Sequence, residues 1–343
     1  MSVGIGNLWA FGGAVTVIFA AAMSAVLILA LFPWLKRYAL AKPNARSSHS
    51  TPTPQGGGVA VIAATIGAVG VALGVFSLGA VPDSPLPAIV VATVAMAGLG
   101  AVDDIRPLPV GPRLILQMLV VAGVLYTLPD GARVLPALPW WVERALLLIG
   151  GLWFVNVVNF MDGIDWMTVA ETIPLTAALV VLGLAQALPP YGTVVALAFG
   201  GAMIGFAYFN RPTAKLFLGD VGSLPIGLML GWLLLLVAAG GHLVAAFVMP
   251  LYYLADATFT LLRRLLRGEP VWQAHRTHLY QRATDRGYSV GAVVARVFLV
   301  NVGLCALAVL TVIAPGTLSD VAALCGGAIL VAWLLVAFAR GNT

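Results

Sequence analysis

Long apolar runs joined by short polar loops make up almost the whole chain. A run of about twenty apolar residues is long enough for an α-helix to cross a lipid bilayer. We predict eleven spans, with approximate limits at 9–32, 57–80, 86–102, 111–128, 142–160, 167–188, 192–209, 222–240, 242–262, 290–313 and 318–339. The pattern therefore predicts an all-α fold, a polytopic transmembrane helical bundle that forms one integral membrane domain over residues 1–343.

Basic residues gather on one side of this predicted bundle. If the N-terminus is periplasmic, the cytoplasmic segments are the C-terminus and residues 33–56, 103–110, 161–166, 210–221 and 263–289. Of the 18 Lys and Arg residues, only Arg133 and Arg144 lie away from these segments. Cytoplasmic loops of membrane proteins carry such an excess of positive charge. The charge pattern therefore predicts a periplasmic N-terminus and a site on the cytoplasmic loops.

Composition excludes a soluble protein. Hydrophobic residues make up 61% of the chain and charged residues only 9%, whereas a soluble domain carries about 25% charged residues. Mean hydropathy is +1.02. Two carboxylates, Glu171 and Asp256, fall within spans, and we expect both to face the protein interior rather than lipid. We expect ordinary solvated charges in the external loops at Asp83, Asp130, Glu143 and Asp320.

The stretch NVVNFMDGID, residues 156–165, places two amides and two carboxylates at the cytoplasmic end of a span. Polar groups at a membrane edge cost solvation free energy unless water, a metal ion or a partner charge satisfies them. Asn156 and Asn159 are three residues apart and share one face of a helix. Amide and carboxylate oxygens are ligands that suit Mg²⁺. We interpret this stretch as the chemical centre of the chain rather than as a plain turn.

Two further motifs lie in the first cytoplasmic loops. PTPQGGG, residues 52–58, ends in three glycines whose N–H groups can approach an anion closely, although a flexible loop before a span explains it equally well. VDDIRPL carries the adjacent carboxylates Asp103 and Asp104, which repel each other and ionise together only near a cation or water. Arg113 opens the helix that follows. A solvated helix end is the alternative explanation, but an acidic pair runs against the basic trend of that side.

Two more motifs occur in the later loops. FLGDVGS holds Asp220 between small residues at the start of a span, where it fits either a metal-bound phosphate or a helix N-cap. HRTHLYQR sets His275 and His278 three residues apart among arginines. No cysteine lies near enough to complete a zinc site, so the cluster suits a diphosphate or nucleotide better, although a basic cytoplasmic loop is the alternative.

The chain resembles the polyprenyl-phosphate N-acetylhexosamine-1-phosphate transferases, glycosyltransferase family 4, in five motifs that follow the family's order: PTPQGGG, VDDIRPL, NVVNFMDGID, FLGDVGSLPIG and HRTHLYQR. This family includes phospho-N-acetylmuramoyl-pentapeptide transferase and the initiating transferases of O-antigen and enterobacterial common antigen. The HLYQR ending is closer to the O-antigen type. The resemblance implies that undecaprenyl phosphate attacks the β-phosphorus of a UDP-N-acetylamino sugar, which gives a lipid-linked sugar diphosphate and UMP.

The resemblance also implies the cofactor, partners and site residues. The cofactor would be Mg²⁺, with Mn²⁺ as a substitute, and the partners would be undecaprenyl phosphate, the UDP-sugar and membrane lipid in a bacterial inner membrane. No nucleic acid is expected, and a homodimer is left open. The implied metal ligands are Asn159 and Asp220. The implied catalytic residues are Asp103, Asp104, Asp162 and Asp165, and the implied substrate-binding residues are Arg113, Asn156, His275, Arg276 and His278.

A phosphate monoester is already largely ionised at neutral pH because its second pKa is about 6. We therefore expect Asp103 and Asp104 to orient the acceptor or assist the metal, with direct displacement rather than a covalent aspartyl-phosphate. In one place the chain departs from the family, which often has a glycine where Trp166 follows Asp165. The large ring leaves GlcNAc, QuiNAc and FucNAc donors all open. A multi-pass transporter of an anion is the alternative function, and a non-catalytic scaffold is a weaker one.

Overall fold

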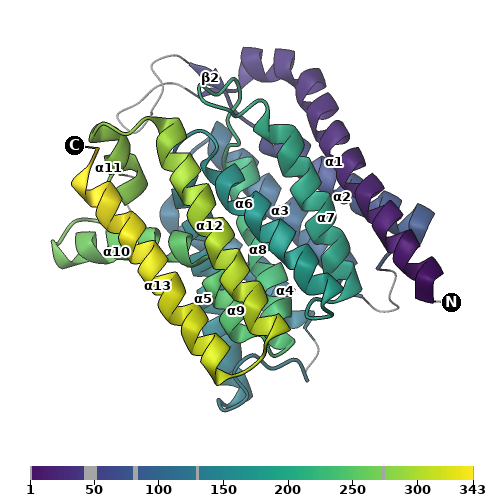
Figure 1. The fold of residues 1–343 in the computed structure, drawn as a ribbon. Helices are drawn as coiled ribbons and strands as arrows, with labels where there is room; N and C mark the ends of the chain where they lie inside the picture. The colour runs from purple at the N-terminus through teal and green to yellow at the C-terminus, as the bar shows by residue number, and fades with distance from the viewer. Residues whose placement is uncertain (1, 42–51, 80–83, 129–130, 272–274, 343) are drawn as a thin grey trace.

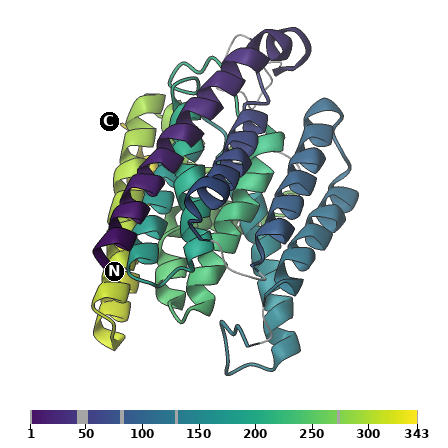
Figure 2. The same cartoon turned by 90° about the vertical axis from the view of Figure 1, so that its right-hand side faces the viewer.

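The chain folds into one bundle of helices, which Figures 1 and 2 show from two sides. The computed structural model describes residues 2–41, 52–79, 84–128, 131–271 and 275–342, with side chains from residue 9 onward. The helices are α1 (Ser2–Tyr38), α2 (Gly58–Phe76), α3 (Leu86–Ile105), α4 (Val110–Tyr126), α5 (Trp140–Met161), α6 (Met167–Leu184), α7 (Pro190–Ala207), α8 (Asp220–Ala239), α9 (Leu243–Val248), α10 (Leu251–Leu266), α11 (Leu279–Asp285), α12 (Val290–Ile313) and α13 (Thr317–Arg340). Two short strands, β1 (Leu40–Ala41) and β2 (Thr53–Pro54), pair antiparallel.

Within the described ranges, nine helices are long and apolar enough to cross a membrane: α1, α2, α3, α5, α6, α7, α8, α12 and α13. Helix α4 is apolar but shorter, at 17 residues. The predicted all-α polytopic bundle is thus confirmed, whereas the number of crossings and their orientation stay predictions. Helix α1 begins and α13 ends at opposite ends of the bundle (Figure 1), as an odd number of crossings requires.

The prediction of one continuous span over 242–262 is wrong. The helical run is interrupted at Met249 and Pro250, which separate α9 from α10. Proline has no N–H to donate, and its ring crowds the carbonyl of the preceding turn, so it weakens a helix at the point where it occurs. Helix α10 then runs crosswise to the long helices and reaches out from the side of the bundle (Figure 1).

Helix α8 lies at the centre of the bundle, and nearly all of its residues are buried. Glycines let two neighbours approach its first turn. A Cβ atom at Gly58 of α2 would lie 2.1 Å from the Cα of Gly222, and one at Gly100 of α3 would lie 2.1 Å from the carbonyl oxygen of Asp220. Only glycine fits at such distances. The backbones of α2 and α3 therefore hold the turn that begins with Asp220.

Three carboxylates that lie in sequence outside the predicted cytoplasmic segments are buried in the described structure. Glu171 and Asp256 are fully buried, which confirms that they face the interior. Glu143 is also fully buried and pairs with Arg133, so the prediction of a solvated loop charge at Glu143 is wrong. Its carboxylate also accepts the N–H groups of Val134 and Leu135. This neutralisation explains why a basic residue occurs at Arg133, away from the other cations. Asp320 is half-buried, and the predicted loop charges Asp83 and Asp130 lie outside the described residues.

Candidate active site

A cleft of about 220 Å³ opens where the end of α3, the end of α5 with the loop after it, and the start of α8 meet. The segment after β2 closes one side of it. Four carboxylates line this cleft, and its walls consist of Gln55, Asp104, Asn159, Asp162, Gly163, Ile164, Asp165, Asn210, Phe217, Leu218, Gly219 and Asp220. The structure thus brings five of the eleven predicted site residues into one cavity: Asp104, Asn159, Asp162, Asp165 and Asp220.

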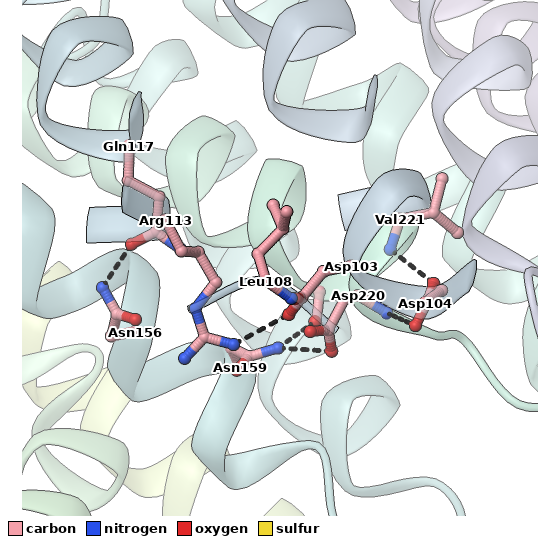
Figure 3. Close-up of polar contacts among 10 residues, drawn as sticks. Asp103, Asp104, Leu108, Arg113, Gln117, Asn156, Asn159, Asp220 and Val221 are labelled. Carbon is pink, nitrogen blue, oxygen red and sulfur yellow. Dashed lines mark hydrogen bonds and ion pairs between the residues drawn. The ribbon is translucent and has the colours of Figure 1, made fainter. Parts of the chain in front are cut away.

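Asn159 and Asp220, the two predicted metal ligands, contact each other although 61 residues separate them. The amide nitrogen of Asn159 donates to Asp220 Oδ1 and to Ser223 Oγ, each at 2.8 Å (Figure 3). Because the amide nitrogen is used twice, the carbonyl oxygen of Asn159 is the atom left to bind a cation. Gly219 precedes Asp220 with φ of 78°, a backbone conformation that favours glycine. The turn at Gly219 aims the start of α8 at the end of α5.

Asp104 joins α3 to the start of α8. Its Oδ1 accepts the N–H of Asp220 and its Oδ2 accepts the N–H of Val221, both at 3.0 Å (Figure 3). The first N–H groups of a helix have no partner within the helix, and a carboxylate there also meets the positive end of the helix dipole. Asp104 therefore caps α8 from another helix and fixes the backbone that carries Asp220.

Asp103 faces a different neighbour. Its Oδ2 accepts from the Arg113 guanidinium at 2.8 Å, and its Oδ1 accepts the Leu108 N–H at 2.6 Å (Figure 3). These contacts close the proline-containing loop between α3 and α4. The predicted substrate-binding residue Arg113 thus lies beside Asp103, and neither of the two forms part of the cleft wall.

Asp162 and Asp165 come from the loop between α5 and α6. Thr168 donates to Asp162, and the backbone N–H of Ala214 donates to Asp165 at 2.9 Å. Burial and then the negative charge of the neighbouring carboxylates, Asp220 foremost, raise the pKa of Asp162 to about 8. Burial and the charge of neighbouring carboxylates thus outweigh the hydrogen bond that stabilises the ionised form of Asp162.

Two of the three amides in the glycine motif are bonded within the protein rather than left for an anion. The N–H groups of Gly57 and Gly58 donate to the carbonyl oxygens of Phe217 and Leu218, each at 2.9 Å. The Phe217 N–H in turn donates to the Pro54 carbonyl at 2.8 Å. The motif therefore fixes the segment before Asp220 and leaves Gln55 in the cleft wall.

Asn156 lies one turn before Asn159, in a contact between α4 and α5. It is buried, and its amide nitrogen donates to Gln117 Oε1 at 2.8 Å (Figure 3). The same nitrogen donates to the Leu152 carbonyl at 2.8 Å. It is not a wall residue of the cleft. The structure therefore offers a helix-packing contact for Asn156, and its predicted substrate-binding role stays a prediction.

The histidine motif packs against the acidic loop without entering the cleft wall. The Tyr280 hydroxyl donates to the Phe160 carbonyl at 3.0 Å, and the ring of the buried His278 stacks on Phe160 and Tyr280. Arg276 pairs with Asp285 at 3.1 Å, and His275 lies beside His278. Of the three predicted substrate-binding residues, His278 thus packs on Phe160 at the end of α5, His275 lies beside His278, and Arg276 is held by α11.

Behind this motif lies Asp256 of α10, whose structural role the sequence analysis missed. Its two oxygens accept the N–H groups of Leu279 and Tyr280 at 2.9 and 3.1 Å, and Oδ1 lies 3.6 Å from His278 Nδ1. An acidic residue inside an apolar run was the available signal. Asp256 caps α11 and so sets the position of the histidine motif.

Trp166 and Asn210 form a second contact that sequence reasoning did not find. Trp166 has φ of 63°, and its backbone N–H donates to Asn210 Oδ1 at 2.8 Å. Its indole N–H donates to the Ala207 carbonyl at 2.6 Å. The positive φ explains why glycine suits this position in the family. The ring is held against the end of α7 and not in the cleft wall, whereas Asn210, in the polar segment after α7, lines the cleft.

An apolar cavity of about 380 Å³ lies farther along the same helices. Residues of α4, α5, α8, α9 and α10 line it, among them Phe154 and Val155 of α5 and Gly227 and Gly231 of α8. Val155 is one turn from Asn159, and Gly227 is about one turn from Ser223. Helices α5 and α8 therefore line both the acidic cleft and the apolar cavity.

The sequence profile of glycosyl transferase family 4 matches residues 86–238, a region that contains three of the five motifs. The chain is 30% identical over 297 residues to decaprenyl-phosphate N-acetylglucosaminephosphotransferase of Mycobacterium tuberculosis, which covers 76% of this chain and 72% of the relative. It is 26% identical over 309 residues to a probable undecaprenyl-phosphate N-acetylglucosaminyl 1-phosphate transferase of Bacillus subtilis, covering 84% of this chain and 82% of the relative. It is also 26% identical to phospho-N-acetylmuramoyl-pentapeptide-transferase of Gloeothece citriformis, over 82% of this chain and 81% of the relative. The chain, a multi-pass membrane protein, therefore belongs to glycosyl transferase family 4.

Proposed function

We propose that this protein transfers an N-acetylamino-sugar 1-phosphate from a UDP-sugar to undecaprenyl phosphate, with release of UMP, in a bacterial inner membrane. The names of its relatives describe transfer of this kind to polyprenyl phosphates. The observation that carries the proposal is the cleft in which Asp220 and Asn159 meet further carboxylates at the ends of membrane helices. A water-soluble donor reaches such a site from the aqueous side, and a lipid acceptor reaches it from the bilayer.

The donor atoms of the cleft fit Mg²⁺, or Mn²⁺ in its place. Across the described residues, no three His, Cys, Asp or Glu side chains form a ready-made metal site. Mg²⁺ does not require one, because it commonly uses one or two carboxylates and completes its shell with water and substrate phosphates. Asp220 and the carbonyl oxygen of Asn159 would hold the ion. When bound, it would neutralise charge on the donor diphosphate.

The apolar cavity supports a lipid acceptor. A polyprenyl chain needs an apolar surface that leads to the reacting phosphate, and the cavity shares the walls of α5 and α8 with the acidic cleft. Its lining is almost wholly apolar, with Trp153 and Trp232 as its largest side chains. The polyprenyl tail of the acceptor and its ionised phosphate would therefore occupy adjoining parts of one site.

The residues of the chain then have separable roles. Asp104 holds the first turn of α8 through two backbone N–H groups, so it positions Asp220 rather than moving a proton. Asp103 and Arg113 fix the loop beside the cleft. Because the acceptor phosphate is already ionised at neutral pH, no general base is required. Direct displacement then depends on positioning and charge neutralisation, which is how phosphoryl transfer is mostly catalysed.

Asp220→Ala tests the proposal, and Asp320→Ala is its control because both residues lie in the first turn of a long helix. Membranes would be incubated with undecaprenyl phosphate and UDP-GlcNAc labelled in the sugar. We expect Asp220→Ala to insert normally and to give no labelled lipid, while Asp320→Ala retains activity. Wild-type transfer by a correctly inserted Asp220→Ala protein would contradict the assignment of Asp220.

The same assay with UDP-GlcNAc, UDP-QuiNAc and UDP-FucNAc identifies the donor. UMP release together with label in the organic phase supports the transferase. Accumulation of intact UDP-sugar inside vesicles, without lipid product, would support the transporter instead. The oligomeric state stays a prediction.

A further inference from the structure

A second polar pocket, of about 170 Å³, lies between the end of α10 and the start of α11. Arginines supply four of its nine lining residues, and one carboxylate faces them. The lining is Phe259, Thr260, Arg263, Arg264, Arg267, Glu269, Thr277, Leu279 and Arg282. None of these residues lines the acidic cleft. We call it the arginine pocket.

Positive charge in the arginine pocket is not balanced by the protein. Glu269 accepts from the buried Arg264 at 2.9 Å, and Arg264 also donates to the Pro270 carbonyl at 3.1 Å. Arg263, Arg267 and Arg282 form no ion pair with a carboxylate in the described ranges. Partial burial and the like charges of nearby arginines lower the pKa of Arg282. Three guanidinium groups therefore remain to meet an anion.

The pocket stands at the level where two spans end. Helix α11 leads through Ser289 directly into α12, and the N–H of Asn342, just after α13, donates to the Arg286 carbonyl at 3.0 Å. Helix α10 carries the arginines on one side and exposed leucines on the other: Leu262, Leu265 and Leu266. Leu266 is 81% exposed. In Figure 1 this helix lies crosswise to the spans and projects from the bundle.

We propose that the arginine pocket binds the phosphate group of an anionic membrane phospholipid, whose acyl chains lie along the apolar side of α10. Arginine forks match phosphate oxygens in pairs of hydrogen bonds. A helix with basic and apolar sides lies in the membrane interface and favours anionic lipids. The exposed leucines argue for a lipid over a free anion, because a soluble phosphate gains nothing from them.

The test uses the full-length protein in nanodiscs of phosphatidylcholine alone or with phosphatidylglycerol. Thermal unfolding followed by tryptophan fluorescence and lipid retention measured by native mass spectrometry are the readouts. We expect phosphatidylglycerol to raise Tm and to be retained by the wild type. The double variant R267Q/R282Q should bind it at least about tenfold more weakly, because both substitutions remove charged hydrogen bonds to the phosphate. The control R37Q/R340Q removes two exposed arginines elsewhere and should behave as the wild type.

Three results would overturn the proposal. The first is the same Tm for the wild type in nanodiscs with and without phosphatidylglycerol. The second is full replacement of the lipid effect by millimolar inorganic phosphate, which would assign the pocket to a free anion. The third is displacement of bound phosphatidylglycerol by the UDP-sugar, which would assign it to the donor. If R267Q/R282Q fails to fold, R267K/R282K keeps both charges without the forks, and its retention should fall between the wild type and zero.

Discussion

Gly100 allows the candidate active site to be disturbed without altering any of its polar groups. In Gly100→Ala the new Cβ atom would lie 2.1 Å from the carbonyl oxygen of Asp220 and 2.4 Å from its carbonyl carbon. Real Cβ contacts essentially never fall below 3.0 Å, so α3 and the start of α8 must separate by about 0.9 Å. Both atoms belong to the backbone, so no side-chain rotation relieves the clash.

This displacement acts on the residue that we assign to the metal. Asp220 accepts from Asn159 at 2.8 Å, and its N–H donates to Asp104 at 3.0 Å. A shift of about 0.9 Å is enough to break either hydrogen bond. Misplacing reacting groups by about 1 Å can cost on the order of 100-fold in rate, and overpacking costs about 1–3 kcal/mol. We therefore expect kcat to fall about 100-fold while Tm falls by only a few degrees.

Gly98 is the matched control, because it lies on the same helix and an added Cβ atom there would meet nothing within 4 Å. Gly98→Ala makes the same chemical change and favours the helix by about 1 kcal/mol. Both variants would be purified in detergent and assayed for transfer of label from UDP-GlcNAc to undecaprenyl phosphate. If Gly100→Ala transfers label as fast as Gly98→Ala, the contact of α3 with α8 does not position Asp220, and the reasoning is refuted.

Three further predictions concern other parts of the molecule. The pKa of Asp162 is raised to about 8 in the folded protein and is near 4 when unfolded, so the metal-free protein should lose stability as pH rises from about 4 to 8. Measurements of Tm across this pH range check this, and Asp162→Asn should make Tm depend less on pH. Asp256→Ala leaves two buried N–H groups of α11 without acceptors, so Tm should fall by the equivalent of about 2–4 kcal/mol. Glu143→Gln weakens the pair with Arg133 at the far end of α5, so the free energy of unfolding should fall by about 1–3 kcal/mol, seen as a lower Tm. The kcat of the folded fraction should be unchanged.

The helices were predictable because an apolar run that crosses a bilayer must make its backbone hydrogen bonds within itself. That rule sets where helices form but not where they break. The run 242–262 is mostly apolar, yet Pro250 divides it into α9 and α10. Burial of charge was less predictable. Glu143 has the sequence surroundings of a loop residue, and only the folded position of Arg133 shows that it is paired inside the protein.

The sequence could predict which residues belong to the site, but not how their side chains are arranged. Five of the predicted residues share one cleft, as expected from polar groups placed at the same ends of spans. Which side chain meets which depends on contacts between distant segments, such as Asn159 with Asp220. Asn156 shows the limit of spacing arguments. It shares a helix face with Asn159, but one turn of rise places it against Gln117 rather than in the cleft.

The acidic pair after α3 shows how the fold uses charge to assemble its own site. Neighbouring residues on a helix point about 100° apart, so Asp103 and Asp104 necessarily meet different partners. Asp103 reaches Arg113 at the start of α4, and Asp104 reaches two N–H groups at the start of α8. One dipeptide therefore ties three helices together at the edge of the cleft. If Asp220 holds Mg²⁺, as we propose, then an Asp104→Ala variant that loses the α8 cap should bind Mg²⁺ more weakly and lose activity, even if Asp104 never touches the substrate.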